Sequence, residues 1–395
     1  MYYPLMENNI EKEDIDVLID FLRTSDRFTN GPKVIEFEKA WSSWLGGGYS
    51  LFVNSGSSAN FITMAAIKEL YSDGEDGEVI VSPIGWESDI ASVIKAGLKP
   101  VFVDVKLNNM AMDTDDVISH ITNKTKAVLL THVLGFDGVS NELLRALEDK
   151  NIKLIEDTCE SHGAMHTDID GKKRKCGTLG FASNFSFYYA HHMSTIEGGM
   201  ICTEDEEFYQ YCRMFRSHGM LRESTNPELR AEWEKRYPNV HKEFLFTVPG
   251  YNFRSTELNA VIGLNQIKRL DDHVQKRTEN FKLFVQHLDS NKFFTDFDIE
   301  GSSNYAFIVI LREKDDALFK RVTDKLSAAG VEYRRGTAGG GNQARQPYVK
   351  KYVPDVDLKK LPVSEHIHEY GLYLGNYPQL ETQKILDVCD ILNKA

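Results

Sequence analysis

Two adjacent histidines, His191 and His192, lie in a segment whose composition suits proton transfer. They follow the aromatic run 185–189, and the turn sequence Glu-Gly-Gly comes soon after them at 197–199. Imidazole has an unperturbed pKa near neutrality, so it can take up and release a proton at physiological pH. This segment is therefore the first candidate for a catalytic loop. A packed, hydrogen-bonded histidine is the alternative, and that alternative is favoured for His192.

A serine-rich turn, Asn-Ser-Gly-Ser-Ser-Ala-Asn at 54–60, follows an expected strand and opens an expected helix. Gly56 allows the tight turn, and the amides and hydroxyls of Ser57 and Ser58 would face an anion at the helix amino terminus. Ser186 could bind the same anion if its strand borders the same cleft. The turn therefore predicts a phosphate-binding cup, although alone it could be an ordinary serine helix cap.

Asp157 ends a buried apolar strand and follows Glu156 directly. A buried carboxylate needs a partner, because an unpaired buried charge is costly. A protonated ring nitrogen of a cofactor would be one partner, and a salt bridge or a helix cap would be another. Trp86 follows the strand expected at 78–82, where its flat ring could stack on a cofactor or simply pack in the core.

Asn252 and Arg254 offer a neutral donor and a cation two residues apart. On an extended segment the two side chains share a face, which suits a phosphate or a carboxylate. The next residues, Ser-Thr-Glu at 255–257, are typical of a helix cap, so the segment could instead belong to a helix start.

The whole-chain composition argues against several classes of protein. The 395 residues carry a formal net charge of −13, which disfavours a nucleic-acid partner. The five cysteines form no CxxC pair, which argues against a disulfide framework, a metal site or an iron–sulfur cluster. No signal peptide or bilayer-length apolar run is visible, so we expect a cytoplasmic protein with no membrane partner. The basic run 172–175 is typical of a solvated hairpin tip.

Short apolar strands alternate with helical patterns as far as residue 217. Strands are expected at 51–53, 78–82, 100–105, 127–132 and 153–157, and helices at 57–71, 87–95, 141–149 and 206–217. This alternation predicts an α/β fold with a mainly parallel sheet covered by helices, and functional groups beyond the carboxyl ends of the strands.

The rest of the chain predicts a second, smaller unit. A polar stretch at 223–249 precedes a helix expected at 256–288, which could link the two units. A strand at 305–311 and a helix at 317–329 follow. The sequence Ala-Gly-Gly-Gly at 338–341 predicts a flexible loop, and a substrate-closing lid is the alternative.

In this order and spacing the motifs resemble the DegT-type sugar aminotransferases, which are pyridoxal-phosphate (PLP) enzymes of nucleotide-linked keto-sugars. The resemblance covers nearly the whole chain and rests on the segments 28–32, 37–38, 55–60, 156–157, 186, 197–199, 216–219 and 250–254. It implies PLP fold type I, with a large cofactor-binding domain at 1–255 and a smaller α/β domain at 256–395.

The resemblance also implies a role for each motif. Ser57, Ser58 and Ser186 would hold the cofactor phosphate, Asp157 would pair with the ring nitrogen, and Trp86 would stack on the ring. Asn252 would reach over from a second subunit, which implies a homodimer with shared active sites. The candidate substrate contacts are Phe28, His218, Arg254 and Arg334, with Arg335 and Arg345 as further candidates for a diphosphate.

Two positions depart from the aminotransferase pattern. The Schiff-base lysine of the family lies six residues before the Glu of Glu-Gly-Gly, and His191 occupies that position here; Glu160 stands where glutamine is usual. Both departures are similar to the 3-dehydratase branch of the family, which acts on GDP-4-keto-6-deoxy-mannose. A histidine there keeps a base but removes the covalent tether. The iron–sulfur 3-dehydratases also use histidine, but they need a cysteine cluster that this chain lacks.

This branch implies a lyase of dideoxysugar and lipopolysaccharide O-antigen biosynthesis. His191 would act as acid and base while the hydroxyl on carbon 3 leaves, Glu160 would contact the cofactor, and L-glutamate would restore the pyridoxamine form (PMP). Neither a metal nor an iron–sulfur cluster is expected. The alternatives are a nucleotide-sugar aminotransferase whose lysine is replaced by histidine, and a non-catalytic family member.

Overall fold

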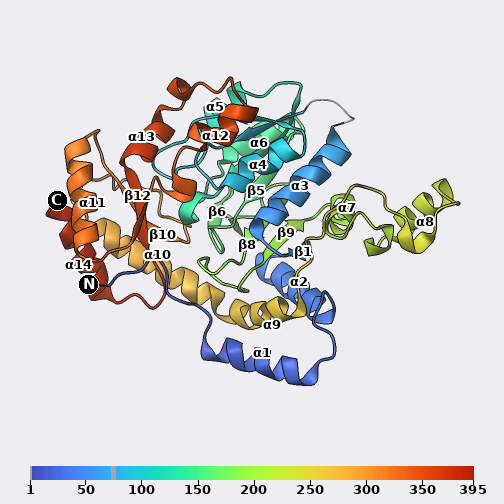
Figure 1. Cartoon of the computed structure of the whole chain (residues 1–395). Helices are drawn as coiled ribbons and strands as arrows, with labels where there is room; N and C mark the ends of the chain where they lie inside the picture. The colour runs from blue at the N-terminus through green and yellow to red at the C-terminus, as the bar shows by residue number, and fades with distance from the viewer. Residues whose placement is uncertain (1, 73–76) are drawn as a thin grey trace.

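A mainly parallel sheet forms the centre of the protein, as a computed structural model that describes residues 2–72 and 77–395 shows (Figure 1). In this part of the chain, seven strands are joined in the order β1-β9-β8-β5-β4-β2-β3. Only β9 runs against its neighbours in this described sheet. The strands are β1 (Tyr49–Val53), β2 (Glu78–Val81), β3 (Lys99–Phe102), β4 (Thr125–Thr131), β5 (Lys153–Asp157), β8 (Ala182–Ser186) and β9 (Gly199–Thr203). The α/β fold class expected from the alternation is confirmed.

The sheet is covered on both faces, which explains why its strands are continuous apolar runs. On one face Val79 and Leu129 pack in a core cluster with residues of α3 (Gly56–Tyr71) and α7 (Glu206–Arg216). On the other face Ile80 and Val128 pack with residues of α5 (Thr114–Ser119) and α6 (Asn141–Asp149).

A second, three-stranded sheet has the order β10-β12-β11 and is antiparallel. Its strands are β10 (Ala306–Ile310), β11 (Tyr333–Arg335) and β12 (Gly371–Gly375), and the helices α11 (Asp316–Ala328), α13 (Pro362–Tyr370) and α14 (Thr382–Asn393) lie beside it (Figure 1). Tyr3, near the amino terminus, joins this unit through a parallel bridge to Val331. Its buried hydroxyl donates a 2.8 Å hydrogen bond to the Gly375 carbonyl.

Two long segments differ from the expected elements. The helix expected at 256–288 is broken into α9 (Glu257–Gln266), a 3-10 turn (Ile267–Arg269) and α10 (Leu270–His287). The polar stretch at 223–249, for which no element was predicted, contains α8 (Pro227–Arg236), which Asn226 caps through its side chain. This helix buries none of its residues, so it has no apolar period that the sequence could reveal.

The remaining helices are α1 (Lys12–Thr24), α2 (Pro32–Leu45), α4 (Glu87–Lys95) and α12 (Pro347–Tyr352). The basic run 172–175 belongs to a hairpin of β6 (Met165–Thr167) and β7 (Lys173–Lys175), and it includes β7 itself as well as the tip. No helix within the described residues has the length and apolar character needed to cross a bilayer.

Candidate active site

The carboxyl ends of β1, β2, β4, β5 and β8 meet around one cavity of about 600 Å³. Its walls contain seven of the residues that the sequence singled out, from five separate segments of the chain: Ser57, Trp86, Asp157, Glu160, Ser186, His191 and Arg334. The position agrees with the rule that ligands of such sheets bind beyond the carboxyl ends of the strands.

The serine-rich turn forms the start of α3, and it opens toward the cavity. Ser55 is the cap residue and accepts a 3.0 Å hydrogen bond from the Ser58 amide. Ser57 lines the cavity, whereas the Ser58 hydroxyl donates to the Asn54 side chain at 2.6 Å and is not part of the cavity wall. A Cβ atom on Gly56 would lie 2.6 Å from that of Ser186, so only glycine allows the helix start to approach β8 this closely.

Asp157 lies buried at the end of β5, where it faces the cavity. Its carboxylate accepts a 2.8 Å hydrogen bond from Asn60 Nδ2 and a 3.0 Å hydrogen bond from the Cys159 amide. Among the described residues no lysine or arginine forms an ion pair with it. Asp157 thus lacks the salt bridge that was one alternative for its partner.

Trp86 is the N-cap residue of α4 and has an exposed side chain, at 58% of its full accessibility. It lines the cavity, so it does not pack in the core. An exposed flat ring in the same cavity wall as a buried carboxylate suits the stacking of a second aromatic ring.

His191 lies in the turn after β8, and its Nδ1 atom is buried with no hydrogen-bond partner among the described residues. Burial lowers the pKa of this imidazole to about 4, an effect that Asp157 opposes and Arg277 strengthens. The pKa therefore differs from the near-neutral value assumed for a free histidine, and His191 is a neutral base at physiological pH.

His192 points away from the cavity, because its Nε2 atom contacts the Ser303 carbonyl at 3.1 Å. It is fully buried and does not line the cavity. The structure thus places His192 as a packed histidine, in agreement with the interpretation favoured from the sequence.

Glu160 lines the same cavity, where its carboxylate accepts a 2.9 Å hydrogen bond from the Leu134 amide. Burial raises the pKa of Glu160 to about 7, the Leu134 amide opposes the rise, and Asp157 adds to it. The carboxyl group is therefore poised to hold or release a proton near neutral pH.

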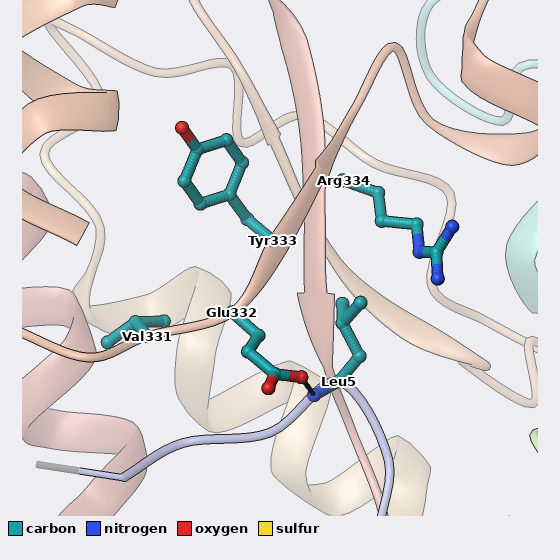
Figure 2. Close-up of a pocket in the computed structure, with 5 residues that line it drawn as sticks. All are labelled: Leu5, Val331, Glu332, Tyr333 and Arg334. Atoms are coloured by element: carbon teal, nitrogen blue, oxygen red, sulfur yellow. Dashed lines mark hydrogen bonds between the residues drawn. The ribbon is translucent and has the colours of Figure 1, made fainter. Parts of the chain in front are cut away.

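Arg334 reaches the cavity from β11, on the opposite side of the strand from Tyr333 (Figure 2). Leu5, Glu332 and Arg334 also line a neighbouring hollow of about 450 Å³, where Glu332 accepts a hydrogen bond from the Leu5 amide. Arg334 forms no ion pair with another described residue, and it is the one cation in the described wall of the larger cavity.

Several other candidates lie away from the cavity wall of this chain. Phe28 packs edge-on against Phe21, and the Arg254 side chain donates to Asn252 at 3.1 Å. The residues placed elsewhere are Phe28, His218, Asn252, Arg254, Arg335 and Arg345. The extended segment and the helix start predicted for 252–257 are both present. Asn252 and Arg254 form β-bridges, and Thr256 caps α9.

The glycine-rich sequence at 338–341 contributes Gly339 to the cavity wall. Gly339 has a positive φ of 59°, and a Cβ atom there would collide with the Gly85 carbonyl. Sequence reasoning missed other wall residues, above all Asp89 and Thr131. Asp89 had a signal, because it lies in the first turn of a helix that opens at a strand end.

The family model of the DegT/DnrJ/EryC1/StrS aminotransferases matches residues 8–393. This chain belongs to that family. It is 31% identical to GDP-4-keto-6-deoxy-D-mannose 3-dehydratase of Yersinia pseudotuberculosis, over 99% of this chain and 98% of the relative. It is 26% identical to GDP-perosamine synthase of Escherichia coli O157:H7, over 100% of this chain and 98% of the relative.

A solved structure of GDP-4-keto-6-deoxymannose-3-dehydratase superimposes with a TM-score of 0.86 at 27% identity, over 99% of this chain and 100% of the other. That protein carries a trapped PLP–glutamate geminal diamine. The fold expected from the resemblance, PLP fold type I, is confirmed.

The cavity fits a cofactor of the PLP type on its own geometry. It offers a helix amino terminus for a phosphate, an exposed ring for stacking, a buried carboxylate with no cation, and a buried imidazole nitrogen without a partner. No lysine is present in the described wall to form a Schiff base.

Proposed function

We propose that this protein is a PLP/PMP-dependent 3-dehydratase of a nucleotide-linked 4-keto-6-deoxy sugar similar to GDP-4-keto-6-deoxy-mannose. The observation that carries the proposal is His191, a neutral imidazole in the cavity wall with Asp157 nearby, at the position of the family lysine. The similarity to a named 3-dehydratase over nearly the full length supports it. A cytoplasmic location belongs to the proposal, and the free cysteines agree with a reducing compartment.

In this proposal the residues of the chain hold the cofactor without a covalent bond. Ser57 and Ser186 bind its phosphate, Trp86 stacks on its ring, and Asp157 holds the proton on its ring nitrogen. When bound, PMP supplies a conjugated ring that takes up the electron pair released with a proton and returns it to expel a hydroxyl group. Glu160 lies in the same wall as a second acidic contact.

His191 moves the proton. As a neutral imidazole it would take up the proton released beside the amine of the bound cofactor, and it would become an imidazolium in surroundings that disfavour its charge. Its low pKa makes that imidazolium a stronger acid than a free one, so it would pass the proton to the oxygen that leaves carbon 3 of the sugar. L-Glutamate is the amino donor of the proposal, in line with the PLP–glutamate adduct of the solved relative.

The reaction products distinguish this function from the aminotransferase alternative, which the 26% identity to GDP-perosamine synthase supports. The protein is incubated with glutamate and GDP-, dTDP-, UDP- or CDP-linked 4-keto-6-deoxy sugars, and products are read by mass spectrometry. We expect one substrate to lose water and ammonia to be released, whereas an amino-sugar product would identify an aminotransferase.

The matched variants are His191→Asn and His191→Lys. Loss of a general base costs about 10²–10⁴-fold in rate, so His191→Asn should lose dehydration by that factor. His191→Lys keeps a basic group but binds it covalently to the cofactor, so this variant should lose dehydration as well. Only His191→Lys should carry the cofactor covalently after borohydride reduction, as an added mass in the spectrum of the protein. If His191→Lys dehydrates as fast as the parent, the role of His191 is wrong.

A homodimer with shared sites is also part of the proposal. Asn252 is exposed and outside the cavity wall of its own chain, so it is free to serve another copy. Mixed Asp157→Asn and Asn252→Ala proteins, each inactive alone, should regain activity after refolding together, because one site of a mixed dimer then keeps both residues. Independent sites would stay inactive in the mixture.

A further inference from the structure

A second buried carboxyl, Asp89, lies beside Asp157 in the cavity wall. Asp89 belongs to the first turn of α4, and both side chains are nearly inaccessible to solvent. Asn60 Nδ2 donates to both of them, at 2.9 Å to Asp89 and 2.8 Å to Asp157. A single nitrogen atom therefore holds one oxygen of each carboxyl group close to the other.

The orientation of the Asn60 amide is fixed by its neighbours. Asn184 Nδ2 donates to Asn60 Oδ1 at 2.8 Å, and Thr63 donates to Asn184 Oδ1 at 2.9 Å. Because Asn60 Oδ1 is used as an acceptor, its nitrogen must face the carboxyl groups. Thr131 donates to the other oxygen of Asp89 at 2.9 Å.

No positive charge balances this pair within residues 2–72 and 77–395. The titratable groups that act on Asp89 from the neighbouring elements are Asp157 of β5, Glu160 and Cys159 after it, and Tyr348 of α12. Each of these groups is an acid, and His191, a base that acts on Asp157, is held neutral by its burial. Two adjacent buried carboxylates without a cation cannot both stay ionised, so the pair retains one proton.

The proton belongs to Asp89 rather than to Asp157. Burial raises the pKa of Asp89 well above its usual range, and the neighbouring Asp157 adds to the rise. Asp157 also keeps an amide donor of its own, the Cys159 N–H, which stabilises its charged form.

We propose that Asp89 keeps its proton at neutral pH and hydrogen-bonds to Asp157, so that the two form a carboxyl–carboxylate pair with a single negative charge. The part of this inference that concerns the cofactor rests on the proposed function. One charge on the pair matches one proton on the cofactor ring nitrogen, and the O–H of Asp89 keeps the carboxylate of Asp157 in place. Asp89 is thus a positioning residue.

Infrared spectroscopy of the cofactor-free protein tests the shared proton without any activity. A protonated carboxyl has a C=O stretch separate from that of a carboxylate. We expect this band at pH 7.5 in the parent and its loss in Asp89→Asn. Glu160→Gln is measured beside it, because Glu160 titrates near pH 7 and contributes a band of its own. A spectrum at pH 7.5 in which Asp89→Asn removes no such band overturns the proposal.

Cofactor affinity, measured by quenching of tryptophan fluorescence with PLP, tests the second half. A neutral amide can replace a neutral carboxyl, so Asp89→Asn should bind PLP within about threefold of the parent, whereas Asp157→Asn should bind about tenfold more weakly or worse. Equal tenfold losses in both variants would mean that Asp89 is charged, which overturns the proposal. If neither variant changes affinity while the infrared band is present, the pair exists and the ring-nitrogen role of Asp157 fails.

Discussion

Glu156 and Asp157 are consecutive residues of one buried strand, yet their carboxylates have opposite surroundings. Glu156 accepts four hydrogen bonds, from His132 Nε2 at 3.0 Å and from the amides of Gly177, Leu179 and Gly180 at 2.7–2.8 Å. Asp157 points to the other face of β5 and accepts hydrogen bonds from Asn60 and Cys159 among the described residues, beside the one proposed from Asp89. The first carboxylate is closed by protein donors, and the second is open toward a cavity.

The same contrast holds for two other residue types. His132 is closed, because it pairs with Glu156 and accepts a 3.0 Å hydrogen bond from the Gly138 amide, whereas His191 has a buried nitrogen without a partner. Arg345 is paired with Glu365 and Glu369, whereas Arg334 is unpaired among the described residues and faces the cavity. Ionisable groups thus hold the fold together where they are closed and are available for ligands where they are open.

The largest expected effect is the difference in stability lost when Glu156 or Asp157 of β5 is replaced. Glu156→Ala leaves His132 and three backbone amides without their acceptor, so it should lower the free energy of unfolding by about 3–5 kcal/mol. Asp157→Asn should cost only about 1 kcal/mol, because it removes fewer interactions. Urea unfolding monitored by circular dichroism measures both. Equal losses of stability in the two variants would end the distinction between closed and open carboxylates.

A smaller effect is expected on nucleotide affinity, which should depend on Arg334 and not on Arg345. Arg334→Gln should weaken the binding of a nucleotide diphosphate such as GDP by about tenfold, because one charge-assisted hydrogen bond contributes about 1.5 kcal/mol. Isothermal titration calorimetry at two salt concentrations measures the loss. Arg345→Gln is the matched control and should leave the affinity unchanged, since its guanidinium is already bound to Glu365 and Glu369. A loss confined to Arg345→Gln would reverse the assignment.

The smallest effect concerns Glu160 and pH. The pKa of Glu160 is raised by burial from 4.5 to about 7, so the folded protein holds a proton that the unfolded chain releases. This contribution to stability is complete below pH 4.5 and is lost as the pH rises through 7. The urea midpoint of the parent, relative to that of Glu160→Gln, should therefore fall between pH 5 and pH 8. A constant difference between the two proteins would show that Glu160 is ionised throughout.

The sequence was sufficient for β1 to β5 of the seven described strands, whereas no bounds were predicted for β8 and β9. A strand end such as Asp157 could be found because an apolar run stops at a polar residue, and parallel strands bring their ends together. Ser186 ends the mixed polar strand Ala-Ser-Asn-Phe-Ser, so it was identified through the resemblance instead. The place of Asp89 in the first turn of a helix after a strand end could be read from the sequence, but its shared contact with Asn60 could not. The helix α8 was missed because it has no buried face.

Arg345 was proposed from the sequence as a diphosphate contact, but the structure shows it in ion pairs within the protein. Its side-chain type fits a diphosphate, but the carboxylates that bind it are on the later helix α13, 20 residues away for Glu365, and tertiary packing alone brings them together. His191 was found by its position in a pattern, while its low pKa depended on burial that no local sequence reveals.

The bridge between Tyr3 and Val331 has a consequence for synthesis on the ribosome. Tyr3 is made before its backbone partners Gly330 and Glu332, and the Gly375 carbonyl follows it by 372 residues. The ring of Tyr3 is fully buried in the folded protein, so it stays exposed to solvent until the second sheet has formed around it. In Figure 1 the two chain ends lie close together beside α14, where this last closure takes place. The contact between Tyr3 and the second sheet thus forms only after both of these distant segments have been made.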